Sequence, residues 1–341
     1  MSASPKILLV KLSSLGDVLH NLPIVWDLRA RLPDAQIDWV VEEGYVHLLE
    51  PLLSHNNFRG IDRIIPFGLR RWKKNLLRLS TWKEWFAFRK ALQETTYDVC
   101  IETQGLIKSA IVCALAKKSA HAVVAGLANA TEFSGYEPLA RSFYSQSVQV
   151  PKQCHAVDRS RWVMCSALDW PLLARTNNPQ FYPASFVEGI PRVPLAGLKS
   201  PYVLFFHSTA REAKRWANDD WIALGKELAV RGYQVVLPWG SAKEKEVSRS
   251  LAAKIPNAFV PPAFSIEQAF SFISGAALTV GVDTGLTHLA AVLDKPTVEI
   301  YCDSPRWKTE GYWSERIANV GDIQNPPSME VVLDSAIKLL A

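Results

Sequence analysis

The sequence predicts an α/β protein of two domains, each a parallel β-sheet with helices packed against it. Short apolar runs alternate with segments of helical periodicity through both halves of the chain, which is the pattern of βαβ units. A segment rich in proline and glycine, without periodicity, separates the halves at 187–201. At 341 residues the chain is long for one hydrophobic core and sufficient for two. We therefore expect a first domain at 1–186, a linker at 187–201, a second domain at 202–327, and a helix at 328–341 that packs back on the first domain.

The composition is that of a water-soluble protein with an anionic partner. The formal net charge is +5, and hydrophobic residues make up 48% of the chain. The five cysteines are odd in number and lack a C-x-x-C pair, which is typical of reduced thiols in a cytosolic protein. The sequence shows neither a secretory signal nor an uncharged apolar run long enough to span a bilayer. We therefore expect a soluble or peripheral protein.

The first element is a strand, a polar turn and a helix near the start of the chain. Ile7–Val10 is an apolar run of buried-strand type, and helical spacing begins at Leu15. Pro23 predicts a kink after the first helical turns. Asp17 lies at the helix start, beside a glycine that permits close approach to the backbone. Asp17 could cap the helix, or it could accept a proton from an attacking hydroxyl group.

The first half continues with strands at 36–41, 98–101 and 122–125 and with a helix at 106–116. The loop 103–105 follows a strand, so we expect it at the same rim of the sheet as Asp17, where ligands of open α/β sheets bind.

A basic and aromatic segment interrupts this pattern at 70–90. Eight basic residues and five aromatic rings stand there against one acid, Glu84. The segment could be a solvated helix over the core, or a surface for phosphates and carboxylates that rests on a membrane interface. With a single basic stripe and no nucleic-acid motif, nucleic acid is the weaker alternative.

The second half opens on the apolar strand 202–206. Hydroxyl and basic side chains follow between His207 and Trp216, which suits a polyanionic ligand such as a pyrophosphate or is a plain polar loop. A further strand at 234–238 leads into a helix that contains Glu244. This carboxylate could bind ribose hydroxyls or be a solvated helix residue.

A second strand–turn–helix element lies at 278–291. A β-branched strand ends in Asp283-Thr284-Gly285, and a helix follows directly. The free N–H groups of a helix start, a glycine and a hydroxyl together favour phosphate binding. His288 lies one turn inside this helix, and we favour a ligand-binding role for it over a structural one. A strand is predicted at 297–301.

Several motifs are absent. The chain has no G-x-G-x-x-G after its first strand, no G-x-x-x-x-G-K-[ST] and no G-x-S-x-G, which argues against a dinucleotide dehydrogenase, a P-loop NTPase and a serine hydrolase. It also lacks H-E-x-x-H and grouped metal ligands.

The segments 10–20, 39–44, 70–72, 237–240 and 282–288 closely resemble the lipopolysaccharide heptosyltransferases of glycosyltransferase family 9. The first of these, with Ser-Ser-Leu-Gly-Asp-Val-Leu-His, is more similar to the type I branch than to type II. The resemblance covers nearly the whole chain. It implies a GT-B fold, in which two Rossmann-like domains face each other across a cleft.

The resemblance also implies an activity: transfer of L-glycero-D-manno-heptose from ADP-heptose to the first Kdo of Kdo2-lipid A, with inversion and without a metal or other cofactor. It implies catalytic roles for Asp17, as general base, and Lys214. Donor-binding positions would be Ser13, Thr209, Glu244, Asp283, Thr284, Gly285 and His288. Acceptor-binding positions would be Arg70, Arg71, Lys73 and Lys74. It further implies a cytoplasmic enzyme, peripheral on the anionic surface of the inner membrane.

The chain departs from the family pattern at two places. Ala210 stands where a second threonine is common, and Cys302-Asp303 replace Gly-Pro after the strand at 297–301. Alternatives are a type II-like enzyme, a sugar-nucleotide epimerase on the same scaffold, or a non-catalytic anion- or membrane-binding protein.

Overall fold

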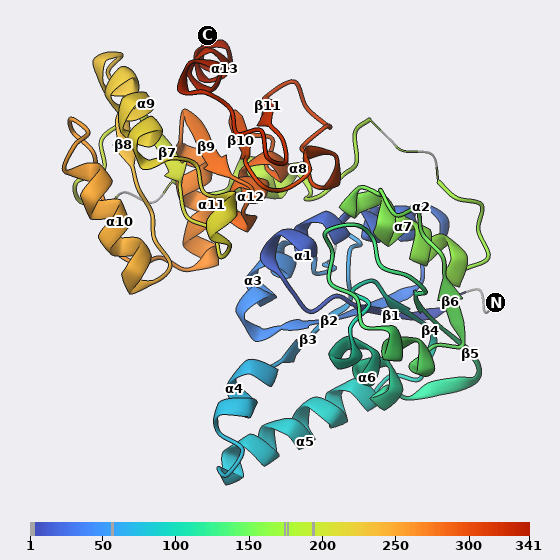
Figure 1. Ribbon diagram of the computed structural model, residues 1–341. Coiled ribbons are helices and arrows are strands. Elements are labelled where there is room, and N and C mark those ends of the chain that lie inside the picture. Colours follow the sequence, from blue (N-terminus) through green and yellow to red (C-terminus); the bar gives the residue numbers. More distant parts are fainter. Residues whose placement is uncertain (1–3, 56–57, 174, 176, 193–194) are drawn as a thin grey trace. The chain divides into compact units, whose positions relative to one another are not determined.

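The computed structural model describes all residues except 1–3, 56–57, 174, 176 and 193–194. It divides the chain into a first unit, Met1–Thr176, and a second unit, Asn177–Ala341. Each unit is a parallel sheet with helices (Figure 1).

The first unit is built on a six-stranded sheet of order β3-β2-β1-β4-β5-β6. Its central strands are buried along almost their whole length, which is why their sequences are mostly apolar. The strands are β1 (Lys6–Val10), β2 (Gln36–Glu42), β3 (Arg63–Phe67), β4 (Tyr97–Glu102), β5 (Lys118–Leu127) and β6 (Gln146–Val148). The helices are α1 (Leu15–Asn21), α2 (Pro23–Arg31), α3 (Val46–Leu49), α4 (Leu69–Lys74), α5 (Leu79–Gln93), α6 (Ile107–Leu115) and α7 (Ala156–Ala167).

The second unit is built on a five-stranded sheet of order β11-β10-β9-β7-β8. Its strands are β7 (Tyr202–Phe206), β8 (Gln234–Val236), β9 (Leu278–Val282), β10 (Thr297–Tyr301) and β11 (Ile317–Gly321). Its helices are α8 (Ala184–Gly189), α9 (Asn218–Val230), α10 (Ala242–Ala252), α11 (Ile266–Gly275), α12 (Gly285–Val292) and α13 (Met329–Leu340).

The predicted kink at Pro23 is a break between two helices. α1 ends at Asn21, and Pro23 is the first residue of α2, where its missing N–H costs no intrahelical hydrogen bond. The strands β3, β6 and β11 and the helix α7 are not among the elements that the sequence predicts.

The division between the units comes ten residues before the predicted end of the first domain, at 176 instead of 186. Aromatic packing explains the difference. The ring of Phe181 lies 4.5 Å from that of Trp313, and the rings of Tyr182 and Phe186 pack against Phe270. Of the predicted linker 187–201, Val193 and Pro194 lie outside the described residues, and the remainder belongs to the second unit.

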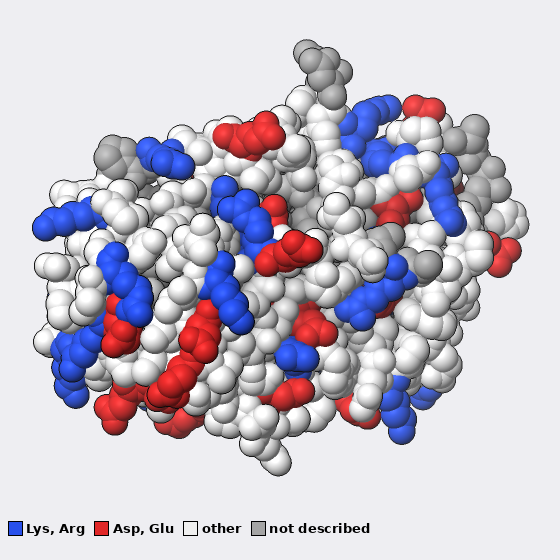
Figure 2. All heavy atoms as spheres, turned by 90° about the horizontal axis from the view of Figure 1, so that it is seen from above, with Lys and Arg blue, Asp and Glu red and all other residues white. Residues whose placement is uncertain are grey.

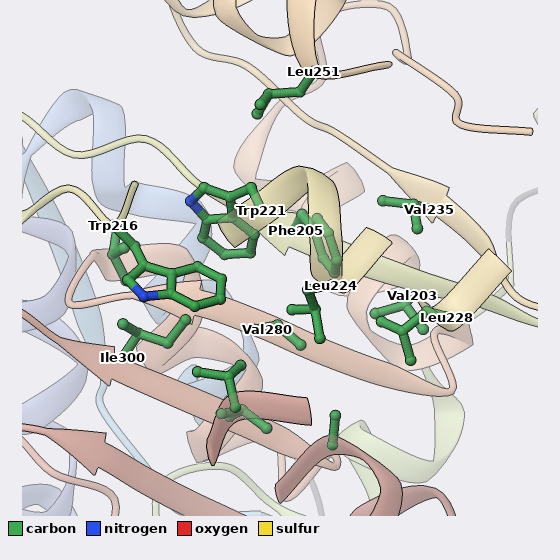
Figure 3. Close-up of a cluster of buried hydrophobic side chains, with 14 of the residues drawn as sticks. Val203, Phe205, Trp216, Trp221, Leu224, Leu228, Val235, Leu251, Val280 and Ile300 are labelled. Carbon is green, nitrogen blue, oxygen red and sulfur yellow. The ribbon is translucent and has the colours of Figure 1, made fainter. Parts of the chain in front are cut away.

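The terminal helix α13 contributes its apolar face to the core of the second unit. Val332 and Ala336 are fully buried in the cluster that also contains Phe205 and Trp221, and α13 contacts α9, β9, β10 and β11. We expected this helix to pack back on the first domain; its buried face is instead part of the second unit. Figure 3 shows this core, in which the rings of Trp216 and Trp221 meet edge to face at 5.0 Å.

Charge is mixed on the face of the molecule that Figure 2 shows. On the face shown in Figure 2, Lys and Arg side chains alternate with Asp and Glu, so the excess positive charge is not gathered into one patch there. In the described part of the chain, no helix combines the length and the apolarity that crossing a membrane requires.

Candidate active site

The first candidate group lies where the strand order of the first unit reverses. β1 pairs with β2 on one side and with β4 on the other, and ligands of open α/β sheets bind at the carboxyl ends of such strands. The turn after β1 is joined here to the loop after β4. The Leu12 N–H donates to Gln104 Oε1 at 2.9 Å, and Lys11 Nζ donates to the Thr103 carbonyl at 3.2 Å. The predicted meeting of these two loops is confirmed.

Asp17 caps its own helix and still reaches solvent. Its Oδ2 accepts from the Ser14 N–H at 3.1 Å and from the Ser14 hydroxyl at 2.9 Å. Asp17 Oδ1 points toward two cations, with Lys11 Nζ at 3.8 Å and Arg159 Nη2 at 3.5 Å. The Asp17 side chain is 38% exposed, whereas those of Lys11 and Arg159 are 2% and 5% exposed. The structural and the chemical interpretations of Asp17 are therefore compatible.

The surroundings of Asp17 keep its carboxylate ionised. Burial raises its pKa, but Lys11, Arg159 and the two hydrogen bonds from Ser14 outweigh burial, and the net pKa lies well below the ordinary value. Two buried cations face one carboxylate, so the cluster of Lys11, Arg159 and Asp17 carries a net positive charge. Asp17 is thus in the unprotonated form that a general base needs, although its low pKa makes it a weak base in the ground state.

Ser13, predicted to bind the donor, is buried in the first unit. Its hydroxyl oxygen accepts from Gln104 Nε2 at 3.3 Å and from Lys108 Nζ at 3.1 Å. Lys108 Nζ also lies 3.0 Å from Glu42 Oε1. Ser13 is therefore part of a polar network with Gln104, Lys108 and Glu42.

The four predicted acceptor-binding residues all lie on α4. Arg70 pairs with Glu42, and Arg71 pairs with Glu43 and Glu84. The remaining two, Lys73 and Lys74, are exposed. Trp72 anchors α4, because its ring is buried against Phe67, Trp85 and Phe88. The segment is therefore anchored through its aromatic residues and presents its cations outward.

The second candidate group lies where the strand order of the second unit reverses, between β7 and β9. The turn His207–Thr209 follows β7, and Asp283-Thr284-Gly285 follows β9. Thr284 is the N-cap residue of α12, and its side chain makes no cap hydrogen bond. Its hydroxyl and the first N–H groups of α12 are available to an anion.

A row of alternating charges links this turn to the sheet. Lys214, from the short 3-10 helix Glu212–Lys214, forms an ion pair with Asp283 Oδ2. Asp283 Oδ1 lies 2.9 Å from His288 Nε2, and His288 Nδ1 lies 2.9 Å from Glu299 Oε1 on β10. The sequence analysis selected Lys214, Asp283 and His288 separately, and the structure brings all three together.

The pKa values of this row shift toward the charged forms. Burial lowers the pKa of His288, but Glu299 and Asp283 raise it to about 9. Burial raises the pKa of Asp283, but His288 and Lys214 hold it well below the ordinary range. His288 is therefore an imidazolium that donates from both ring nitrogens.

A pocket of about 560 Å³ opens beside the β7 turn. Thr209 and Glu244 both line it, together with His207, Ser208 and Trp216. Glu244 is held in place, because its Oε2 accepts from the Gly240 N–H at 2.7 Å and the Ser241 N–H at 3.0 Å. The volume is in the range of nucleotide and drug-sized ligands.

The predicted site residues are divided between the two units. Thr209, Glu244, Lys214, Asp283, Thr284, Gly285 and His288 lie in the second unit; Ser13, Asp17, Arg70, Arg71, Lys73 and Lys74 lie in the first. Within the described residues, no cluster of three or more His, Cys, Asp or Glu is arranged to hold a metal ion.

Three residues of the site were not selected from the sequence. Lys11 stands directly after the first strand, and Arg159 lies on α7, in a region without a recognisable motif. Glu299 had a visible signal, since it is the one charged residue of the strand Thr297–Tyr301, and the structure buries it completely.

Comparison with known proteins places the chain in a family. The model of glycosyltransferase family 9 (heptosyltransferase) matches residues 85–339. The chain belongs to glycosyltransferase family 9.

Several curated heptosyltransferases match most of the chain. Lipopolysaccharide heptosyltransferase 1 of Pseudomonas aeruginosa is 38% identical over 328 residues, which are 95% of this chain and 86% of the relative. Lipopolysaccharide heptosyltransferase 1 of Escherichia coli (strain K12) is 37% identical over 296 residues, 87% of each chain. The resemblance stated from the sequence motifs is confirmed.

The solved structures agree. The E. coli heptosyltransferase WaaC with ADP is 31% identical, with a TM-score of 0.79 over 98% of this chain and 100% of that one. WaaC with ADP-2-deoxy-2-fluoro heptose is 32% identical, with a TM-score of 0.73 over 98% of each chain. The protein is thus a glycosyltransferase with the GT-B fold, as its family and motifs predict.

Proposed function

We propose that this glycosyltransferase moves L-glycero-D-manno-heptose from ADP-heptose to the first Kdo of Kdo2-lipid A, with inversion. The observation that carries the donor half is the second-unit switch point, where Lys214 pairs with Asp283 just before the start of α12. A pocket of nucleotide size opens beside the same β7 turn, and Glu212 and Arg215, the sequence neighbours of Lys214, line it. WaaC, the structural relative, was solved with ADP and with an ADP-heptose analogue. The curated relatives named lipopolysaccharide heptosyltransferase 1 support the acceptor class.

The proposed reaction is a single displacement at the anomeric carbon. The acceptor hydroxyl oxygen forms the new bond to the anomeric carbon as the bond to the ADP β-phosphate oxygen breaks, and ADP leaves with that electron pair. Asp17 takes the proton from the acceptor hydroxyl. Because the pKa of Asp17 is low, this transfer occurs late, when the attacking oxygen carries positive charge.

The leaving ADP gains negative charge, which the second unit is equipped to stabilise. Lys214 supplies a cation, and the first N–H groups of α12 lie at the positive end of the helix dipole. Thr209 and Glu244 line the pocket. In the proposed complex Glu244 contacts the ribose, and Thr209 contacts the phosphates and the heptose. ADP-heptose is the donor substrate, and the proposal requires no further cofactor.

The direct test measures ADP release from ADP-heptose with and without Kdo2-lipid A. Asp17→Asn should lower kcat by roughly 10²- to 10⁴-fold, the usual contribution of a general base, while ADP binding is retained. Ser14→Ala is the matched control, because it removes a capping partner of Asp17 and leaves the carboxylate. Unchanged turnover in Asp17→Asn, or an equal loss in Ser14→Ala, would refute the assignment of the base.

We further propose that the enzyme is cytoplasmic and peripheral on the anionic inner membrane, through the segment 73–86, here called the α4–α5 tip. In Figure 1 this tip projects at one end of the first unit. Its large apolar side chains are strongly exposed, namely those of Leu76, Leu77, Leu79, Trp82 and Phe86. Lys73, Lys74, Arg78 and Lys83 lie among them.

This combination suits the headgroup region of an anionic bilayer. Leucine and aromatic side chains enter the interface, and lysine and arginine side chains attract the phosphates. Trp72, Trp85 and Phe88 pack the segment against its own unit. The exposed side chains of the tip are therefore not needed for that packing and can contact a bilayer. A lipid acceptor embedded in the same bilayer would then reach the site without leaving the membrane.

A further inference from the structure

The further inference concerns Glu299, a buried carboxylate that the proposed reaction does not use. Glu299 lies at the middle of β10 and is 0% exposed. Its Oε1 faces His288 Nδ1 at 2.9 Å. Its Oε2 accepts from the Gly311 N–H at 2.8 Å and from the Tyr301 hydroxyl at 3.2 Å. A charge in such a position needs compensation, and His288 provides it.

His288 is held between two carboxylates. Asp283 approaches one ring nitrogen and Glu299 approaches the other, so both nitrogens must carry hydrogen atoms to make these bonds. With Glu299 in place the imidazole ring is therefore cationic. Lys214, Asp283, His288 and Glu299 form a row of alternating charges with a net charge of zero.

The other end of this row is Lys214, the cation proposed to meet the donor diphosphate. In the structure its ammonium group is paired with Asp283. The diphosphate must compete with Asp283 for this ammonium group. If Lys214 moves away, Asp283 keeps His288 on one oxygen and the Ser304 hydroxyl, at 2.5 Å, on the other.

We propose that Glu299 is a positioning residue: through His288 it keeps Asp283 neutralised when Lys214 leaves Asp283 for the donor diphosphate. The inference rests on the proposed donor function of this site. Glu299 itself does not touch the donor. Without the negative charge of Glu299, His288 can lose its proton, and Asp283 then has only Lys214 as its cation. Lys214 would be held more tightly and would be less available to the diphosphate.

The charged and titratable groups around His288 define the pH range in which Glu299 has this effect on Asp283. Asp283 and Glu299 face the ring directly, Lys214 lies behind Asp283, and the Tyr301 hydroxyl is bonded to Glu299. α12 also packs on α11, whose one acid, Glu267, is exposed. The pKa of His288 is raised to about 9, so the wild-type ring stays cationic through neutral pH. In Glu299→Gln we expect the pKa to fall toward the ordinary value, about 6.5.

The experiment measures ADP affinity by calorimetry at pH 6 and pH 8 in the full-length protein. Wild type at each pH is the reference, because the terminal phosphate of ADP itself loses a proton in this range. Glu299→Gln should bind like wild type at pH 6 and roughly tenfold more weakly at pH 8, the scale of one charge-assisted hydrogen bond. The KM for ADP-heptose should rise in parallel. Glu299→Asp, which keeps the charge, should restore most of the affinity at pH 8.

A second readout does not depend on ligand binding. Proton NMR of the His288 ring should show an imidazolium at pH 8 in wild type and a neutral imidazole in Glu299→Gln. Tyr301→Phe is the matched control, because it removes a hydrogen bond to the same carboxylate and leaves its charge. Its ADP affinity should follow that of wild type at both pH values.

The proposal would be overturned if the ratio of the ADP affinities of Glu299→Gln and wild type were the same at pH 6 and pH 8. It would also be overturned by a His288 ring that is still cationic at pH 8 in this variant, or by a Tyr301→Phe variant with the same loss as Glu299→Gln. If wild type binds no ADP, the proposed donor function fails instead, and the NMR titration still tests the link between Glu299 and His288.

Discussion

The proposed membrane contact of the α4–α5 tip gives a prediction whose size follows from exposed side chains. Leu77 is 101% exposed and Leu79 is 80% exposed, so both side chains have nearly their full apolar surface to place in a bilayer. Complete burial of one leucine side chain stabilises by roughly 1.5–3 kcal/mol. Because an interfacial side chain is only partly withdrawn from water, we take about 3 kcal/mol for the pair, which is roughly 100-fold in affinity.

We therefore expect Leu77→Ser/Leu79→Ser to bind vesicles of phosphatidylglycerol and phosphatidylethanolamine roughly 100-fold more weakly than wild type, by co-sedimentation. The matched control is Leu139→Ser, a 69% exposed leucine of the same unit outside the tip. Its vesicle affinity should change by no more than about twofold, as for ordinary surface substitutions.

The electrostatic contribution to vesicle binding can be separated from the apolar contribution by raising the salt concentration. Lys73→Ala/Lys74→Ala should lose about 2 kcal/mol, since each lysine near an anionic surface contributes about 1 kcal/mol. This loss should disappear at high salt, whereas the loss from the leucine pair should persist. ADP release with a deacylated, water-soluble acceptor should be unaffected by the leucine substitutions. Wild-type vesicle affinity in the leucine variant, or an equal loss in Leu139→Ser, would refute the tip as the membrane contact.

Two other predictions address the second unit. Lys214→Met should weaken ADP binding roughly 10- to 100-fold in calorimetry, which is the range for a hydrogen bond to a charged group. The control is Lys254→Met, a substitution of an exposed lysine, which should leave ADP affinity unchanged. Equal ADP affinities of the two variants would contradict the role of Lys214. Val332→Ala should lower the free energy of unfolding by about 2 kcal/mol in urea, because Val332 is fully buried in the second core. Its neighbour Val331 is 48% exposed, and a Val331→Ala variant as unstable as Val332→Ala would show that α13 is not held by this face.

The sequence by itself determined the fold class and the family, and it selected most residues of the candidate site. Strands such as 202–206 are apolar over their full length because parallel strands are buried on both faces, and this signal is local. The turns at Asp17 and at Asp283 were recognisable because a strand, a polar turn and a helix follow one another directly in the chain. Family motifs then supplied roles that local chemistry had left open between capping and catalysis.

The tertiary structure alone decided how charges far apart in the sequence compensate one another. Arg159 reaches Asp17 across 142 positions of the chain, and Glu299 meets His288 only because β10 lies beneath α12. Ionisation depends on the total field at a site, and no local pattern records which distant cation or carboxylate contributes to it. For the same reason the boundary at 176 and the packing of α13 followed from aromatic and aliphatic contacts that the periodicity of the chain does not contain.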